Sequence, residues 1–466
     1  MNKLVRNELY KIFHKKGIYI LLIITCGLAL LSAVLSSVLD DSLMNSMVIP
    51  VARQSLEVYD VNKPDEAAAY VELKLEVDKY DLMAEIGFKS TSPEYYYLQN
   101  VVAESMRKFY NEKYIKKDEV AAEEAQKELD AKIETLKHFD WKQYVNERIE
   151  EVKANEALSE NVKKEVLRSL QYRLDHNLPY KYSQASNDLD SYAQALLQYE
   201  TMEKDESRYF NRDALLQKRE IESEVEIGKY KLDNNLIKDY GDSGTAQDAV
   251  LSVFGNASIF LLVCILMIAG TIVAEEFNKG TIKQLLTRPY CRSKILVSKI
   301  IATFITIVAY VLVYAIFLTL VTGITTGSFG SLLDPVLYYN FNSHSVVALN
   351  TVLACLLSFA GILPQIIILT LFTILISTLT GNTSVSVILG FILTFMSELF
   401  LGFVSKVKIL SLWPTFNWDL NVFFFGGIHR IEAFTFTKAI IVDIVTVIVL
   451  TVVSLIVFKR KDIKNQ

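Results

Sequence analysis

Residues 275–299 read EEFNKGTIKQLLTRPYCRSKILVSK, a short charged segment between two long apolar runs. The apolar runs of this chain each reach the roughly 20 residues that a helix needs to cross the hydrocarbon core of a bilayer. Because a lone strand in lipid would leave its backbone groups unpaired, every run is expected to be helical. The sequence therefore predicts an all-α membrane protein with six transmembrane helices, at 18–39, 250–274, 297–322, 347–378, 383–404 and 438–458. The fourth run contains Pro364 three residues after Gly361, so a kink or a break is expected there.

Charge is distributed unevenly along the chain. Residues 40–248 contain 44 Asp or Glu and 29 Lys or Arg, a net charge of −15, whereas the remaining residues carry +10. The chain as a whole is 51% hydrophobic with a mean hydropathy of +0.26, although 22% of its residues are charged. The charged residues are therefore segregated from the apolar runs, and we expect residues 40–248 to form a separate domain between the first and second spans.

Lysine and arginine gather in three short flanks, which we expect to be cytoplasmic because that side of a membrane protein is richer in these residues. The flanks are the N-terminal segment, residues 275–299 and the tail 459–466, while the 323–346 loop has none. Both termini are thus predicted to be cytoplasmic, and residues 40–248 extracytoplasmic. The 405–438 loop should be external and departs from the rule, with Lys406, Lys408, Arg430 and Lys438.

The N-terminal segment, residues 1–17, repeats apolar positions at helical spacing: Val5, Leu9, Ile12 and Phe13. This pattern predicts an amphipathic helix on the inner leaflet, and an ordinary basic flank is the alternative. The apolar run at 18–39 is too long for the core of a secretory signal, which favours an uncleaved anchor over a signal peptide.

The 40–248 domain is predicted to be helical. It has no cysteine, because Cys26, Cys264, Cys291 and Cys355 all lie elsewhere, so disulfides are not expected to stabilise it. Apolar residues recur every three or four positions, at Leu129, Ile133 and Leu136, at Val145, Ile149 and Val152, and at Val162, Val166, Leu170 and Leu174. Ser92-Pro93-Glu94 and Ser159-Glu160 are typical of helix starts, and Asn177-Leu178-Pro179 of a helix end. We expect five or six helices, some of them long, in an extended bundle or coiled-coil-like arm without a deep globular core.

Motifs for catalysis are absent from the sequence. It has no phosphate-binding loop G-x-x-x-x-G-K-[ST], no G-x-G-x-x-G, no H-E-x-x-H, no G-x-S-x-G and no C-x-x-C. The histidines His14, His138, His176, His344 and His429 are too scattered to predict a metal site. We therefore expect no enzyme activity, cofactor or metal in this chain, and no nucleic-acid partner.

The chain begins with a basic amphipathic segment, a first span, a large external insertion and a second span. The motif E-E-F-x-x-G-T-I-K-x-L-L-T-x-P-x-x-R follows at 275–292, and four more spans follow the motif. This order and this motif resemble the permease subunit of a bacterial ABC-2 type transporter. The resemblance covers the whole membrane part. It implies that residues 275–296 form a coupling helix that docks into a separate ATP-binding cassette ATPase subunit, which holds ATP-Mg. It also implies a second permease, as a homo- or heterodimer, and location in the bacterial plasma membrane. Cys291 and the size of the 40–248 insertion depart from the family pattern.

The chemistry of the segment agrees with that implication. Gly280 can end the second span, Thr281 can cap a new helix, and Pro289 can end it. Leu285 and Leu286 then lie on an apolar side that suits a socket on a partner; a basic stop signal with an interfacial helix is the alternative. The predicted coupling residues are Glu275, Glu276, Gly280, Thr281, Lys283, Leu285, Leu286, Pro289 and Arg292.

Residues 411–436 resemble the external helical hairpin that re-enters the outer leaflet in members of this family. The aromatic residues of this segment fit an interfacial belt; they are Trp413, Trp418, Phe423, Phe424 and Phe425. Two carboxylates, Glu398 and Asp443, lie inside predicted spans, where a charge is costly and faces a cavity, a partner or water. Either they pair with Lys406 or Lys438, or they line a substrate path.

Together these features predict a permease subunit of an ATP-binding cassette transporter that exports a peptide, antibiotic or lipid-like substrate. The alternative is a membrane sensor or scaffold whose extracytoplasmic arm binds an envelope or peptide partner. An ion-coupled secondary transporter is disfavoured, because charges and inverted repeats are scarce in the spans.

Overall fold

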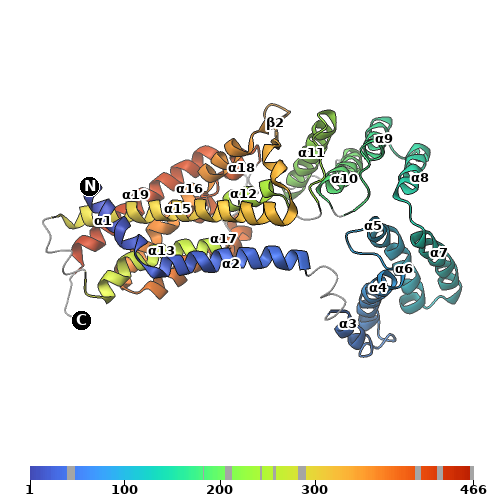
Figure 1. The fold of residues 1–466 in the computed structure, drawn as a ribbon, viewed down its shortest axis with the longest axis horizontal. Helices are drawn as coiled ribbons and strands as arrows, with labels where there is room; N and C mark the ends of the chain where they lie inside the picture. The colour runs from blue at the N-terminus through green and yellow to red at the C-terminus, as the bar shows by residue number, and fades with distance from the viewer. Residues whose placement is uncertain are drawn as a thin grey trace.

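The structure is a computed structural model, which describes residues 1–38, 48–181, 183–204, 212–241, 244–255, 259–281, 290–404, 411–427 and 434–461. The described residues form an elongated helical bundle with a helical arm at one end (Figure 1). Helix α1 (Asn2–Phe13) and the C-terminal end of α19 (Phe436–Arg460) lie at the opposite end of the bundle. We call these two ends the arm end and the termini end.

The bundle further contains α2 (Lys16–Val38), α12 (Ala246–Gly255), α13 (Ile259–Asn278), α15 (Arg292–Thr326), α16 (Thr351–Thr380) and α17 (Thr383–Val404). Within the described residues, four segments are long and apolar enough to cross a membrane: Leu261–Asn278, Arg292–Thr326, Thr351–Thr380 and Phe436–Arg460. Helices α1 and α2, bent by 60°, form a fifth candidate if they are counted as one span. The chain thus has the helices of a membrane protein, while the count of six spans stays a prediction.

Two predicted spans differ in detail from the helices. The run at 250–274 is divided between α12 and α13, and α13 continues to Asn278. The run at 347–378 is one helix, α16, with Pro364 inside it, so the expected break does not occur. Proline removes one donor from the backbone ladder, but thirteen residues precede it and sixteen follow it, enough turns on each side to keep the helix continuous.

The arm has two lobes, each with its own apolar core. Lobe 1 is formed by α3 (Ile49–Leu56), α4 (Pro64–Ile86), α5 (Pro93–Tyr97), η2 (Leu98–Val102), α6 (Ala103–Tyr110), η3 (Asn111–Lys116) and α7 (Glu119–Lys137). Lobe 2 is formed by α8 (Trp141–Ala154), α9 (Glu160–Asp175), α10 (Gln184–Lys204) and α11 (Arg212–Asp233). Leu75, Leu98 and Leu136 lie in the first core, and Val145 and Leu189 in the second.

The apolar stripes of the arm behave as predicted, because Leu129, Leu136, Val145 and Val152 are all buried. The Ser92 side chain caps α5 by accepting a hydrogen bond from the backbone amide of Tyr95. The expectation of five or six helices without a deep core is wrong: the described arm has nine α-helices, and the two lobes bury separate clusters. Short turns divide the predicted long helices, and the resulting antiparallel neighbours cover each other's apolar stripes.

A β-hairpin, which the sequence did not predict, joins the arm to the bundle. Strand β1 (Val336–Asn340) pairs antiparallel with β2 (Ser345–Leu349), and α11 of lobe 2 packs against both strands. Asp334, just before β1, accepts hydrogen bonds from Lys238 Nζ and from the Tyr240 hydroxyl, each at 2.5 Å. Since β1 and β2 connect α15 to α16, the hairpin links lobe 2 directly to two membrane-spanning candidates.

Residues 411–427 fold back into the bundle at the arm end through η7 (Pro414–Phe416) and α18 (Asn421–Phe424). Trp418 is 5% exposed and packs with Leu262, Ile368 and Leu369, so the prediction that it belongs to an interfacial belt is wrong. Trp413, by contrast, is half exposed. The segment is therefore anchored inside the bundle and not merely laid on its surface.

Candidate functional site

A network of four charges, centred on the buried Lys299 and Glu8 and edged by the more exposed Lys11, lies at the termini end. Lys299 Nζ is 2.7 Å from Oε2 of Glu8 and 2.7 Å from Oε1 of Glu276, and its side chain is 0% exposed. Lys11 Nζ lies 3.1 Å from Glu8 and 3.2 Å from Glu276. Two cations and two anions therefore neutralise one another, which offsets the high cost of removing each charge from water.

The network joins three helices that are distant in sequence. Glu8 and Lys11 are on α1, Glu276 is on the last turn of α13, and Lys299 is on the second turn of α15. Ile12 of α1 is buried in the same region against α13 and α15. Helix α1 is amphipathic, as predicted, and its inward side packs on the bundle.

A second set of contacts holds the start of α15. Arg292 Nη1 donates to the backbone oxygen of Lys459 at 3.0 Å, which ties α15 to the end of α19. Lys461 Nζ donates to the backbone oxygens of Thr378 and Leu379 at the end of α16 and lies 4.2 Å from the ring centroid of Phe277 on α13. Cations near helix C-termini are favourable because the terminal carbonyl groups lack partners.

These contacts are made by residues on both sides of residues 282–289 in the sequence. Lys283, Leu285, Leu286 and Pro289, all predicted coupling residues, fall in this range and lie outside the described residues. Helix α13 precedes this range and α15 follows it. Glu276 of α13 forms an ion pair with Lys299 of α15, so the two helices are held together.

The remaining predicted coupling residues lie where the segment meets the bundle. Glu275 and Glu276 belong to α13, and Arg292 begins α15, so residues 275–296 are not one separate helix. Gly280 has φ of +66°, a conformation that glycine adopts without strain, and it follows the last turn of α13 as predicted. The Thr281 hydroxyl donates to the backbone oxygen of Glu276.

Glu275 is also held by charge, with Lys15 Nζ at 3.0 Å and Lys279 Nζ at 3.3 Å. Charge patterning alone assigns Lys11, Lys15 and Lys299 to the basic flanks of the spans and gives Glu8 no role. Two features of the sequence indicate Glu8 and Lys299 as unusual: Glu8 is the single acidic residue among residues 1–17, and Lys299 lies inside an apolar run. A lone charge in an apolar helix normally has a partner.

Asp443 is a second candidate, on α19 toward the arm end. It is 4% exposed, and neither of its carboxylate oxygens has a hydrogen-bond partner among the residues that the structure describes. Lys438, one of its two predicted partners, instead donates to the Ser411 hydroxyl at 2.6 Å. Lys406 and the side chain of Glu398 lie outside the described residues. A buried carboxylate in an apolar bundle is costly unless it has a partner, so Asp443 stays a candidate site residue.

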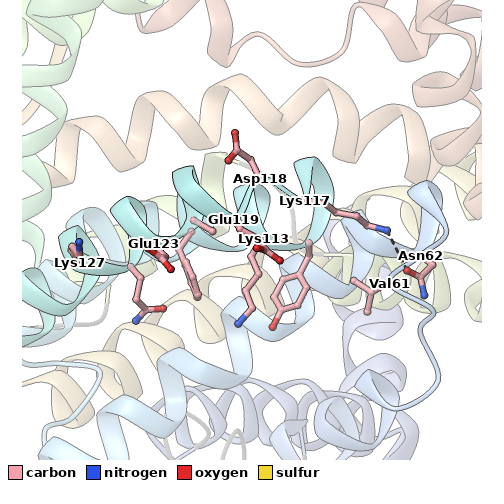
Figure 2. A pocket seen from close by; sticks show the side chains of 12 residues that line it. Val61, Asn62, Lys113, Lys117, Asp118, Glu119, Glu123 and Lys127 are labelled. Atoms are coloured by element: carbon pink, nitrogen blue, oxygen red, sulfur yellow. Dashed lines mark hydrogen bonds between the residues drawn. The ribbon is translucent and has the colours of Figure 1, made fainter.

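The arm also has a surface groove of 820 Å³, lined mainly by residues of η3 and α7 and of the turn between them (Figure 2). Its floor includes Phe109, Tyr114 and Ala122, and Lys113 Nζ lies 5.2 Å from the Phe109 ring centroid. No group of three or more His, Cys, Asp or Glu in the described part of the chain is arranged to hold a metal ion.

Residues 237–464 are similar to a family described as a protein of unknown function (DUF2705). No curated protein matches the chain. The matched range begins near the end of the arm and covers the bundle from α12 onward, so it includes Glu276, Lys299 and Asp443 but neither lobe of the arm.

Proposed function

We propose that this chain is the membrane-spanning permease subunit of an ATP-binding cassette transporter of the ABC-2 type. A separate ATPase subunit, holding ATP-Mg, would dock against residues 282–289, and a second permease would complete the substrate path. The substrate class expected from the sequence is a peptide, an antibiotic or a lipid-like molecule, and both termini would be cytoplasmic in a bacterial plasma membrane.

The observation that carries this proposal is the shared burial of Lys299 against Glu8 and Glu276. A docking segment can change the conformation of a membrane bundle only if its movement is transmitted to the helices. This network joins the C-terminal end of α13 to the N-terminal part of α15. Glu276 Oε2 is buried and has no hydrogen-bond partner among the described residues, so this acceptor would be available to a donor that arrives on docking.

The test uses the tagged chain purified in mild detergent from membranes of its own cells. We expect an ATP-hydrolysing subunit to copurify, and Leu285→Asp with Leu286→Asp to abolish its association while membrane insertion is retained, because two carboxylates cannot enter an apolar socket. Leu333→Asp, at a residue that is 91% exposed at the arm end, is the matched control and should keep the partner. If the double variant still binds and stimulates the ATPase, residues 282–289 are not the docking segment.

A sensor or scaffold is the second candidate function, supported by the contacts that run from arm to bundle. The amide of Leu420 donates to the backbone oxygen of Gly361 on α16, and the Tyr338 ring on β1 packs edge-on to Phe425. A shape change in lobe 2 would therefore reach α16 through β1 and residues 411–427. Copurification of an envelope protein or a peptide, without an ATPase, would favour this function.

A further inference from the structure

The two lobes of the arm meet around a cavity of 610 Å³. Lobe 1 contributes Tyr96, Tyr97 and Glu104, and lobe 2 contributes residues from α8, α9 and α10, among them Tyr144 and Arg173. Cavities at the junction of two structural units are common positions for ligand sites, because each unit supplies one wall. We call this space the inter-lobe cavity.

The positive charges of the inter-lobe cavity already have partners. Arg173, 1% exposed, donates to Asp190 at 2.7 Å and to the Ser186 hydroxyl at 3.0 Å, and its guanidinium lies 3.8 Å from the ring centroid of Tyr180. Burial raises the pKa of Asp190 above its ordinary value, although Arg173 opposes this. Of the other cations, Lys132 is paired with Glu128 and Arg148 with Glu151. An anionic ligand would therefore find no free cation there.

Two negative charges in the cavity lining are left over. Glu104 and Glu147 both line the cavity, and neither forms an ion pair with any residue that the structure describes. Glu147 accepts one hydrogen bond, from the neutral amide of Gln143 at 2.9 Å. The cavity thus has an excess of negative charge, within a domain whose net charge is −15 over residues 40–248.

The walls between these carboxylates are aromatic. Tyr96 and Tyr180 stack at 4.5 Å between ring centroids, and Tyr144 packs edge-on to Tyr180 at 5.4 Å. Burial raises the pKa of Tyr180 to about 12, so this ring stays neutral at physiological pH. Aromatic faces attract cations and also cover the apolar stems of long side chains.

We propose that the inter-lobe cavity binds a cationic, partly apolar ligand, such as the lysine side chains and neighbouring aromatic residue of a cationic peptide. Unpaired carboxylates would hold the ammonium groups, and the tyrosine rings would cover the apolar part. The groove of Figure 2 is less suited, because its cations Lys113 and Lys127 offset its carboxylates Glu119 and Glu123, none of which forms an ion pair with a residue that the structure describes.

The binding test uses the full chain in nanodiscs of uncharged lipid, without nucleotide, so its result does not depend on an ATPase partner. The probe is a fluorescent, end-blocked Lys-Trp-Lys peptide, and the neutral comparison is Gln-Trp-Gln. We expect saturable binding of the cationic peptide that weakens with salt, since exposed charges are screened over about 10 Å at 0.1 M. Binding of the two peptides with equal affinity would overturn the proposal.

Two double variants locate the binding. Glu104→Gln with Glu147→Gln should weaken affinity about ten-fold, as expected for loss of two charge contacts. Glu119→Gln with Glu123→Gln makes the same change of net charge in the groove of Figure 2 and should leave affinity unchanged. An equal loss in both would mean that net charge alone attracts the peptide, which contradicts a specific cavity. Hydrogen exchange provides a second measurement: peptide binding should protect 96–104 and 144–155 and not 109–127.

Discussion

Lys299 Nζ lies 2.7 Å from Oε2 of Glu8, although the two residues are 291 positions apart in the chain. The contact places the N-terminal helix against the segment that follows residues 282–289. Lys299 also binds Glu276, on the helix that precedes this segment. Helices α1, α13 and α15 therefore share one buried cation, and the first helix of the chain is part of the frame around the proposed docking segment.

Removal of this cation should destabilise the bundle. Lys299→Met keeps the length of the side chain but leaves Glu8 and Glu276 with Lys11 alone, and breaking a buried ion pair typically costs about 3–5 kcal/mol. We expect a lower midpoint of thermal unfolding in detergent. Lys294→Met, at an exposed position on the same helix, is the control and should change little. Equal midpoints for the two variants would show that the network does not stabilise the bundle.

Sequence patterns predicted the parts of the fold that depend on local periodicity. The stripe Val162, Val166 and Leu170 is buried in α9, and the amphipathic start became α1, because side chains three or four positions apart share one side of a helix. The charge difference between residues 40–248 and the remainder predicts a separate extracytoplasmic domain, and this stays a prediction.

Contacts between distant segments escaped prediction. Nothing near Lys299 in the sequence indicates Glu8 as its partner, and nothing near Trp418 indicates that it lies against Leu262 and not at an interface. The two lobes also could not be foreseen, since apolar spacing tells which side of a helix is buried but not against which helix. For the candidate site, residue types were predicted on both flanks, whereas the network that joins them became evident only in three dimensions.

The packing of residues 411–427 depends on the absence of a side chain at Gly361. A Cβ at this position would lie 2.1 Å from Oδ1 and 2.9 Å from the backbone nitrogen of Asn421. Gly361→Ala should therefore displace α18 and cost about 1–3 kcal/mol of stability, as overpacking usually does. Gly27→Ala, on α2 with nothing within 4 Å, is the matched helical control and should be neutral or slightly stabilising. The same unfolding midpoint for both variants would show that α18 does not depend on this close approach.

The predicted orientation can be tested with the natural Cys291, which is exposed beside the 282–289 segment. On intact cells an impermeant thiol reagent should not label it, whereas permeabilised cells should show labelling. Lys137→Cys, at the exposed end of α7, should be labelled on intact cells because the arm is predicted to be extracytoplasmic. Labelling of Cys291 from outside, with Cys26, Cys264 and Cys355 replaced, would reverse the orientation.

Acid should weaken the contact between α6 and α7. Hydrogen bonds from Lys108 and Lys132 lower the pKa of Glu128 from 4.5 to about 2. Because this pKa is lower in the folded state, the stabilisation is present above pH 4.5 and is lost as the pH falls from there toward 2. Glu128→Gln should therefore lower the unfolding midpoint at pH 6 by a small amount, as exposed pairs do, and make no difference near pH 2. An equal decrease at both pH values would show that the effect is not electrostatic.

Substitution of Asp443 tests whether its carboxylate serves the function of the protein or the stability of its fold. Its carboxylate is buried and has no hydrogen-bond partner in the described part of the chain, so Asp443→Asn, which keeps the shape and removes the charge, should raise the unfolding midpoint. If the carboxylate serves transport, the same variant should uncouple ATP hydrolysis by the copurified partner from substrate, which is the usual cost of stabilising a functional position. Asp443→Glu keeps the charge but adds a methylene group to a packed helix, so it should lower the midpoint. A lower midpoint for Asp443→Asn would mean that the ionised carboxylate stabilises the bundle, and Asp443 would then be a structural residue.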